Sequence, residues 1–252
     1  MPVVIYSTQD PAGVNIAENL REMGQEVLRT EQPLLYSERF LKDIDTDFIV
    51  FASKHKSEKG VPAFTVHVPG NWNAADMGGQ PGQVAFSGPI RMKGIAVQME
   101  KERQMNASSM PEFLFSLEVD HHGPMSETPC AFVELGSTER EWSDRKLGAA
   151  VARAIANGLK ERITVKEVVF GVGGGHYCPA FTRMELGTDI AVSHVLPGHH
   201  IDGIGYETFL QGIERGERKT DTVALDWKGL KGSQREKILS FVEKAGVKWR
   251  KV

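Results

Sequence analysis

The sequence predicts an α/β fold in which a mixed central sheet is covered by helices on both faces. Short apolar runs of strand length alternate along the chain with segments whose apolar residues recur at helical spacing. The 252 residues, 40% of them hydrophobic, are enough to bury a sizeable core. Neither a change in composition nor a low-complexity linker divides the chain, so we expect one domain over residues 1–252.

The expected strands begin at the amino terminus and recur as far as the last third of the chain. They cover residues 2–7, 47–53, 64–70, 113–120, 130–136, 166–175 and 221–227, with the sixth running into a glycine loop. Most are continuously apolar, which is typical of strands buried on both faces. The run at 113–120 alternates instead, with Ser116, Glu118 and Asp120 opposite its apolar face, so we expect it to be half-buried.

Three segments have helical periodicity. We expect a helix from about residue 10 to residue 23 and a longer one from about 143 to 159, where apolar residues follow the helical period throughout. Near the carboxyl end, Ser233 and Glu236 form a capping-box pattern ahead of an apolar stripe, and Gly246 ends it.

Composition and patterning argue against several protein classes. The longest apolar runs are far shorter than the roughly 20 residues of a membrane-spanning helix, so no transmembrane helix is expected. The amino terminus has neither a basic leader nor an apolar stretch of signal length. Cys130 and Cys178 are too few for a disulfide framework or for a thiolate metal site of their own. We therefore expect the protein in the reducing cytoplasm.

The charges are distributed unevenly along the chain. The formal charge of the whole chain is −3, but residues 228–251 contain eight basic and two acidic residues, a net +6 that leaves −9 elsewhere. A basic segment on an acidic protein is typical of a surface that binds a polyanion such as RNA. A solvated surface helix with a basic end is the alternative explanation.

The eight histidines occur in short polar stretches, most of them beside glycine or proline. These stretches are "SKHKSEKG", "TVHVPGNW", "EVDHHGP", "GGGHYCP" and "SHVLPGHH". In an α/β fold the loops at the carboxyl ends of the strands carry the functional groups. A single histidine before a turn is usually structural, but the repetition indicates that several histidines converge on one pocket.

The residue types in these turns suit a metal site. Imidazole and carboxylate are the ligands that zinc takes without thiolates, and catalytic zinc keeps one position for water. The candidates are Glu118, His121, His122, Glu134, His176, His194, His199 and Asp202. The spacing contains no H-E-x-x-H and selects no coordination set. The same groups could also act without metal, with a histidine or glutamate positioning water as general base.

Two other features of the sequence give weaker indications of function than these turns. "GVGGG" at 171–175 follows a predicted strand, but His176 stands where the third glycine of a dinucleotide fingerprint would fall, and no helix is expected directly behind it. Its glycines still let backbone amides approach a phosphate or an oxyanion. Cys178 and His176 could form a nucleophile and base, although side chains two residues apart in an extended loop need not meet. No G-x-S-x-G nucleophile elbow is present.

Seven stretches, taken as an ordered set, carry a family resemblance. They are "PVVIYSTQDPAGVNI", "ASKHKS", "VHVPGNW", "LEVDHHGP", "FVELGSTEREW", "GGGHYCP" and "SHVLPGHHID". The set resembles the archaeal and plant type of D-aminoacyl-tRNA deacylase, which hydrolyses the ester between a D-amino acid and the terminal ribose of tRNA. The resemblance implies a phosphorylase/hydrolase-like α/β sandwich, zinc dependence with two Zn²⁺ ions per chain, aminoacylated tRNA as the partner, and a monomer.

The resemblance also implies which residues form the site. The positions that match the polar residues of the family are His55, His67, Glu118, His121, His122, Glu134, His176, His194 and His199. The family often has threonine at the position of Asp120, so the resemblance gives this residue no necessary role.

The expected roles fall into three groups. The expected catalytic residues are His121, His122, His176 and Glu134. The expected metal ligands are Glu118, His121, His122, His176, His194 and His199. Contacts with tRNA or the oxyanion are expected from Gly173, Gly174, Gly175, Lys54, Lys56, His55 and His67. The basic segment would bind the acceptor stem through its phosphates.

Three alternative functions have different signatures. A metal-dependent amidase or peptidase would share the pocket but would not use the basic segment, and its activity would survive high salt. A nucleoside phosphorylase would require phosphate as a substrate. A non-catalytic RNA-binding protein would leave the histidine-rich turns unused, and the sequence lacks the aromatic-studded basic motifs of common RNA-binding modules.

Overall fold

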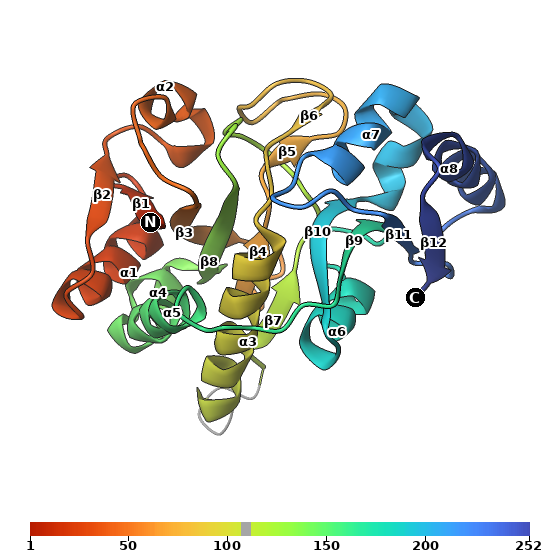
Figure 1. The fold of residues 1–252 in the computed structure, drawn as a ribbon. Helices are drawn as coiled ribbons and strands as arrows, with labels where there is room; N and C mark the ends of the chain where they lie inside the picture. The colour runs from red at the N-terminus through yellow and green to blue at the C-terminus, as the bar shows by residue number, and fades with distance from the viewer. Residues whose placement is uncertain (107–111) are drawn as a thin grey trace.

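The computed structural model describes residues 1–106 and 112–252 (Figure 1). Its largest sheet has six strands in the order β2-β1-β3-β8-β4-β7. Their bounds are Val27–Thr30, Val3–Ser7, Ile49–Lys56, Cys130–Ser137, Ala63–His67 and Leu114–Leu117 in that order. Neighbouring strands are parallel except β8 and β4. The predicted α/β class with a mixed sheet is confirmed.

A second sheet lies beside the first and is entirely parallel (Figure 1). Its strands are β10 (Ile190–Leu196), β9 (Glu167–Val172), β11 (Thr222–Leu225) and β12 (Lys248–Lys251), in this order. A short antiparallel hairpin is formed by β5 (Gly70–Asn71) and β6 (Gln83–Val84). The sequence did not indicate this division into two main sheets.

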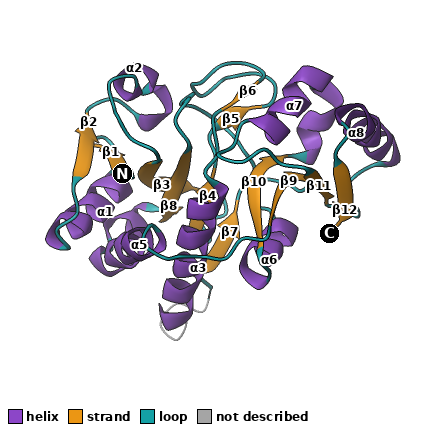
Figure 2. Ribbon diagram, in the orientation of Figure 1, coloured by secondary structure: helices purple, strands orange, loops and turns teal. Residues whose placement is uncertain are grey.

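The helices lie on both sides of the strands in the view of Figure 2, with α1, α5, α3 and α6 along one side and α2, α7 and α8 on the other. The α-helices are Pro11–Glu22, Glu38–Leu41, Pro89–Asn106, Glu139–Ser143, Arg145–Gly158, Pro179–Gly187, Tyr206–Glu214 and Gly232–Ala245, numbered α1 to α8. Two 3₁₀ turns, η1 (Leu34–Tyr36) and η2 (Gly198–Gly203), complete the described elements. Among the described residues, no helix combines the length and apolar character that would let it span a membrane.

The helix predictions were correct where a cap is clear. The predicted helices 10–23 and 143–159 correspond to α1 and α5, and each begins after an aspartate that accepts backbone N–H groups, Asp10 in α1 and Asp144 in α5. The capping box of Ser233 and Glu236 is wrong, because the N-cap of α8 is Lys231, two residues earlier, and Lys231 N–H donates to Gln234 Oε1 at 3.1 Å.

No helix opens directly behind the glycine loop, as expected, but helix α6 follows after the three non-helical residues 176–178. It begins at Pro179, and proline suits the first helical position because its missing N–H would have no partner there.

The strand predicted at 113–120 is shorter and more deeply buried than expected. β7 ends at Leu117, and Ser116, Glu118 and Asp120 are all buried. The prediction of a half-buried strand is wrong, because the residues after β7 lie between the two sheets instead of facing solvent.

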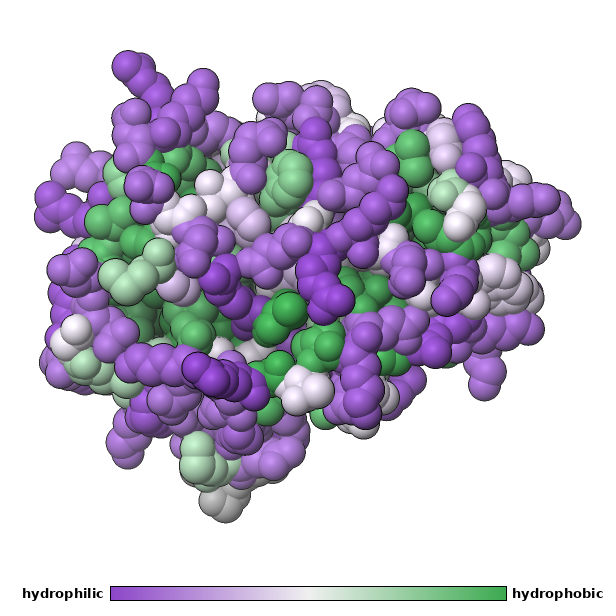
Figure 3. Space-filling model, in the orientation of Figure 1, coloured by the Kyte–Doolittle hydropathy of each residue, from purple (hydrophilic) through white to green (hydrophobic). Residues whose placement is uncertain are grey.

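The two sheets share part of one hydrophobic core. The larger cluster packs α1, α3 and α5 against the six-stranded sheet and also includes Val169, Phe181 and Val192. A second cluster packs α7 and α8 against β9 and β11 around Phe170. Polar side chains cover most of the face seen in Figure 3, and apolar ones show only in patches between them. The single-domain organisation stays a prediction.

Candidate active site

The residues that follow β7 connect the two larger sheets. Glu118 N–H donates to Val66 O of β4 at 3.1 Å. Asp120 N–H donates to Val195 O of β10 at 3.0 Å. The stretch "EVDHH" therefore lies at the junction of the sheets, and its side chains can meet side chains from both.

One face of the six-stranded sheet carries a row of polar side chains. The register places Ser53 of β3, Glu134 of β8, Thr65 of β4 and Ser116 of β7 side by side. Because side chains alternate along a strand, residues two positions further lie on the same face. Those residues are His55, His67 and Glu118. Strand faces thus contribute His55, His67 and Glu134, whereas the histidines were expected on loops at the ends of the strands.

Glu134 lies in the middle of this row and is held by two hydroxyl groups. Its carboxylate accepts hydrogen bonds from Ser53 Oγ at 2.7 Å and Thr65 Oγ1 at 3.0 Å. His55 Nδ1 lies 3.4 Å from Glu134 Oε2 and 3.0 Å from Glu118 Oε1. Burial alone lowers the pKa of His55, but these two carboxylates raise it to about 11. His55 is therefore a cation near neutral pH.

Glu118 is buried among imidazole rings. Its Oε2 lies 3.5 Å from His67 Nδ1. The same oxygen lies 3.7 Å from His121 Nε2 and 3.6 Å from His176 Nε2. These are ion-pair distances without hydrogen-bond geometry, and neither carboxylate oxygen has a hydrogen-bond partner within the described ranges. His55 is the one protonated ring beside this carboxylate and it faces Oε1, so the arrangement favours a further cation beside Oε2.

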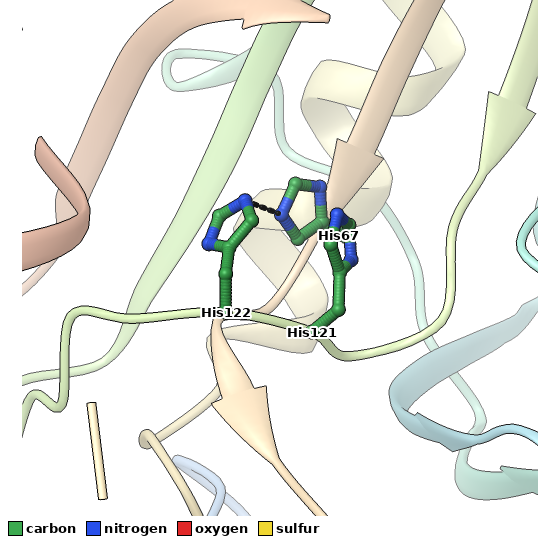
Figure 4. A group of neighbouring side chains, drawn as sticks. All are labelled: His67, His121 and His122. Carbon is green, nitrogen blue, oxygen red and sulfur yellow. Dashed lines mark hydrogen bonds between the residues drawn. The ribbon is translucent and has the colours of Figure 1, made fainter. Parts of the chain in front are cut away.

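Figure 4 shows His67 at the end of β4 facing His121 and His122 from the loop after β7. The Nδ1 atoms of His121 and His122 lie 2.8 Å from Val119 O and 2.6 Å from Gly123 O. Because a carbonyl only accepts, each Nδ1 carries the hydrogen, which leaves each Nε2 with a free lone pair. His122 Nε2 lies 3.3 Å from His67 Nε2.

The pKa values of these three rings are all lowered. Burial, with a further contribution from neighbouring histidines, lowers the pKa of His67. Burial lowers the pKa of His121 and of His122 to about 4. All three rings are therefore neutral near pH 7, which is the state in which imidazole binds a metal ion. His122 also has a φ of 48°, a left-handed conformation that is uncommon outside glycine and concentrates at functional sites.

Two separate groups of these side chains have the composition of zinc sites. One group is His67, His121 and His122, and the other is His55, Glu118 and His176. A third combination, His67, Glu118 and Glu134, overlaps them, and within each group the ligand atoms lie within 4.8 Å of one another. Buried His67 Nδ1 and both Glu118 oxygens have no hydrogen-bond partner among the residues described. The donor set therefore fits a metal ion such as zinc.

Tyr177 belongs to the site and was missed by the sequence analysis. Its hydroxyl lies 2.8 Å from His55 Nε2. On the other side, Trp142 Nε1 donates to His55 O at 3.0 Å.

The sequence contained a signal for the polar face of the sheet. Polar residues recur two positions apart within apolar strands, as Ser53 and His55 do and as Thr65 and His67 do.

The cluster forms one wall of a pocket of about 440 Å³. The predicted catalytic residues that line it are His121, His122, Glu134 and His176. Lys54 and Lys56 line the same pocket and bring positive charge to its wall. Asp10, which caps α1, and Met77 line it from other segments.

The glycine loop leads from β9 into His176. Gly173 N–H donates to Leu196 O at 2.9 Å, so this amide is already used and we leave Gly173 out of the anion contacts. Gly173 and Gly174 have φ values of 116° and 83°, which favour glycine. Anion binding by Gly174 and Gly175 stays a prediction.

Two predicted ligands are not brought into the cluster. His194 Nδ1 lies 2.7 Å from Asp120 Oδ2, and its Nε2 lies 2.6 Å from Arg215 O. Both ring nitrogens are therefore occupied, and His194 ties β10 to the residues after β7. His199 lies in η2 with its ring 4.2 Å from that of His200, and it belongs to none of the candidate metal groups in the described chain. We exclude both from the ligand set.

Cys178 has no role in the pocket. Burial raises the pKa of its thiol well above the usual value, and nearby carboxylates add to this effect. A buried thiol of raised pKa is a poor nucleophile, which argues against a cysteine hydrolase with His176 as base.

Comparison with known proteins adds to this geometry. Residues 42–250 match the family model described as D-aminoacyl-tRNA deacylase. The chain belongs to this family. A D-aminoacyl-tRNA deacylase of Thermococcus onnurineus is 33% identical over 276 aligned positions, which cover 99% of each chain. One of Archaeoglobus fulgidus is 32% identical and covers 98% of this chain and 95% of the relative.

The deacylase family resemblance extends to a solved structure. The crystal structure of a conserved protein of unknown function has 32% sequence identity and a TM-score of 0.89, and the match covers 100% of this chain and 95% of that one. The resemblance carried by the seven sequence stretches is confirmed by the family model and the relatives, and the fold matches that of the solved structure over nearly all of both chains.

Proposed function

We propose that this protein hydrolyses the ester bond of D-aminoacyl-tRNA and releases a free D-amino acid and tRNA. The proposal rests on the buried carboxylate of Glu118 within a ring of histidines, at the wall of a pocket, in a chain of the deacylase family. Such an enzyme would return misacylated tRNA to use in translation.

The metal ligands come from the two separate groups of side chains. We assign one zinc ion to His67, His121 and His122, and a second to His55, Glu118 and His176. When bound, zinc supplies a water of lowered pKa and polarises the ester carbonyl. A second ion would replace the proton that His55 carries between Glu118 and Glu134, so metal binding should release protons.

The protein residues contribute orientation and proton transfer. Glu134 lines the pocket with its carboxylate held by Ser53 and Thr65, so we assign it the proton of the attacking water and the return of that proton to the ribose oxygen. Tyr177 accepts from His55 Nε2 and keeps that ring in place. His121 and His122 are oriented in the same way by backbone carbonyls.

The substrate would approach through its phosphates. Lys54 and Lys56 at the pocket and the basic segment 228–251 provide the positive charge. Phosphate contacts make binding sensitive to salt and largely indifferent to sequence. We place the protein in the cytoplasm, where aminoacyl-tRNA is used, and we expect a single-domain monomer because one chain supplies every residue of the proposed site.

The test is hydrolysis of D-tyrosyl-tRNA and L-tyrosyl-tRNA by the purified protein, before and after exhaustive chelation and after zinc is restored. We expect selective release of D-tyrosine that is lost on chelation and recovered with zinc. D-selective release that survives chelation would keep the function and remove zinc from it. Absence of release from either substrate would contradict the proposal and favour an amidase acting on small substrates.

A further inference from the structure

The carboxyl ends of the four parallel strands form one continuous edge. Adjacent ends are joined by hydrogen bonds from Gly173 N–H to Leu196 O, from Asp226 N–H to Val172 O and from Val252 N–H to Leu225 O, each of 2.9 Å. The order along this edge is β10, β9, β11 and β12. The loop that carries His176 into the pocket leaves β9 at this edge, and Lys251 ends β12 at the same edge.

The distance along this edge is short. Neighbouring strands are about 4.8 Å apart, so the end of β12 lies about 10 Å from the end of β9. Between them, the side chain of Leu230 approaches both Gly173 and Gly198, and Gln234 Nε2 donates to Gly198 O at 2.9 Å. Residues 228–235 therefore follow the edge directly beside the glycine loop.

Aromatic and cationic side chains gather at this edge. The rings of Trp227 and Trp249 are stacked, with centroids 5.7 Å apart and planes at 15°. Arg235 and Lys251 lie over the Trp227 ring, at 4.6 Å and 4.0 Å from its centroid. Trp249 is 42% exposed. Lys228 is also exposed and follows Trp227 directly. We call these five residues the cationic edge.

A second group of basic residues lies at the opposite edge of this sheet. Lys166, Arg218, Lys219 and Lys248 line a separate cavity at the amino ends of the strands. Two acidic residues, Glu167 and Asp221, share that cavity. Lys166 pairs with Asp189 at 2.7 Å and Lys219 with Glu214 at 3.8 Å. The basic segment is therefore not one surface, and Lys248 points away from the pocket side.

We propose that the cationic edge binds the 3′-terminal RNA strand of the substrate, just beyond the nucleotide whose ester is hydrolysed. This inference rests on the proposed function for the position of the reacting ester. Lysine and arginine contact phosphates, and the open face of Trp249 stacks an unpaired base, which is the usual combination in sites for single-stranded nucleic acid. Asp226 faces Gly173 and Gly229, Asp202 accepts from Gln234, and Arg235 donates to Trp227 O, so Lys228 and Lys251 are the cations of this edge that can turn to phosphate.

The test compares two double variants of the full chain. Lys228→Ala/Lys251→Ala removes exposed charge from the cationic edge, and Lys166→Ala/Lys219→Ala removes the same charge from the opposite edge. Binding of fluorescently labelled deacylated tRNA is measured by anisotropy over a range of salt concentrations. We expect the slope of log K against log[salt] to fall by about two units for the first variant, one for each lost phosphate contact, and to remain unchanged for the second.

A third variant tests the stacked base. We expect Trp249→Ala to weaken tRNA binding about fivefold or more. Melting curves of all three variants check that each one still folds. The two variants of the cationic edge should hydrolyse D-tyrosyl-tRNA with a raised KM and an unchanged kcat. Both should have normal kinetics with a D-tyrosyl ester of adenosine, because this substrate has no RNA strand to bind at the edge.

The outcomes separate this inference from the proposed function. If the wild-type protein hydrolyses D-tyrosyl-tRNA and the two double variants have equal salt slopes, RNA binding at the cationic edge is contradicted and the proposed function is not. Wild-type protein that hydrolyses no aminoacyl-tRNA would overturn the proposed function. The anisotropy measurement would still decide whether the edge binds RNA, because it requires no turnover.

Discussion

Glu118 is the residue of the site that we expect to depend most on a bound metal ion, because its buried carboxylate oxygens have no hydrogen-bond partner among the residues described. Because its oxygens lie near four imidazoles and both candidate metal groups, we expect Glu118→Gln to reduce metal affinity and kcat/KM by about 100-fold or more. The metal-free variant should unfold at a lower temperature than the metal-free wild type, because the amide no longer pairs with the protonated His55. Metal analysis, steady-state kinetics and melting curves measure the three effects.

The matched control for this change is Glu127→Gln. Glu127 is exposed in the same loop region, so all three quantities should remain at wild-type values. Normal metal content and activity in Glu118→Gln would show that this carboxylate is no ligand.

Tyr177 acts through His55 in the proposed site. Tyr177→Phe removes the hydroxyl 2.8 Å from His55 Nε2 but keeps the ring, so we expect metal affinity or kcat to fall about 10- to 100-fold with KM unchanged. Titration of the metal-free protein with zinc, followed by steady-state kinetics, checks this. An unchanged kcat at full metal occupancy together with unchanged affinity would contradict the positioning role.

Residue types and order predicted the candidates for the site, but not all of its members. His121, His122 and His176 converge as expected, whereas His194 is held by Asp120 and Arg215. A histidine in "VSHV" looks the same in sequence as the one in "TVHV". Only the pairing of strands decides which of the two faces Glu118, and that information is not local.

At the scale of elements, α3 crosses α5 where two glycines meet. A Cβ on Gly94 would lie 2.4 Å from Gly158 O, a backbone atom that cannot rotate away. We therefore expect Gly94→Ala to lower the free energy of unfolding by about 1–3 kcal/mol. Gly187→Ala is the control, because nothing lies within 4 Å of its added methyl group and alanine favours helix. Urea unfolding of both variants gives the comparison.

The junction of α3, α6 and β10 contains a buried acid. Glu185 Oε2 accepts Val192 N–H at 2.7 Å, and Lys93 Nζ donates to the backbone oxygen of Glu185. Burial raises the pKa of Glu185 from 4.5 to about 8, although Lys93 opposes this effect. The folded state therefore keeps a proton that the unfolded state loses above pH 4.5, and the free energy of unfolding contributed by this group falls between pH 4.5 and about 8.

The variant Glu185→Gln isolates this contribution. It cannot titrate, so its free energy of unfolding relative to wild type should increase from about pH 5 to about pH 8, by on the order of 1 kcal/mol or more. Urea unfolding of both proteins at the two pH values measures the difference. A difference that is constant with pH would mean that Glu185 has an ordinary pKa in the folded state.

Elements were predictable where local signals agreed. Helices α1 and α5 have an aspartate cap and a regular apolar stripe, and both were predicted to within two residues. Helix α3 was missed although Met92, Ile95, Ala96 and Met99 recur at helical spacing, because many charged residues interrupt them. The two-residue strands of the β5–β6 hairpin are too short to produce any period.

At the scale of the whole molecule, a metal ion would bind only the folded chain. The proposed ligands come from β3, β4, the residues after β7 and the loop after β9, which meet only after both sheets have formed. We expect the melting temperature of the chelated protein to rise when zinc is added and to rise further with zinc concentration. Magnesium, which prefers oxygen ligands, serves as the control ion. Equal melting temperatures with zinc and magnesium would contradict the proposed ligand set.

The arrangement of the strands in two sheets was beyond the sequence analysis. β3 and β8 pair although more than 70 residues separate them along the chain, and β10 was not recognised as a strand. Strand pairing at this separation depends on the packing of the complete chain, and periodicity within a short window contains no information about it. The alternation of elements therefore predicted the class, and the structure itself supplied the topology.

Strand β12 is the outermost strand of its sheet and has exposed side chains along its whole length. An uncovered outer strand offers unpaired backbone groups to the same strand of another molecule, which is a common route to aggregation. Three of its four residues, Lys248, Arg250 and Lys251, are positively charged. Two copies brought edge to edge would therefore repel each other, so the side chains that attract a polyanion also protect the protein from fibrous self-association.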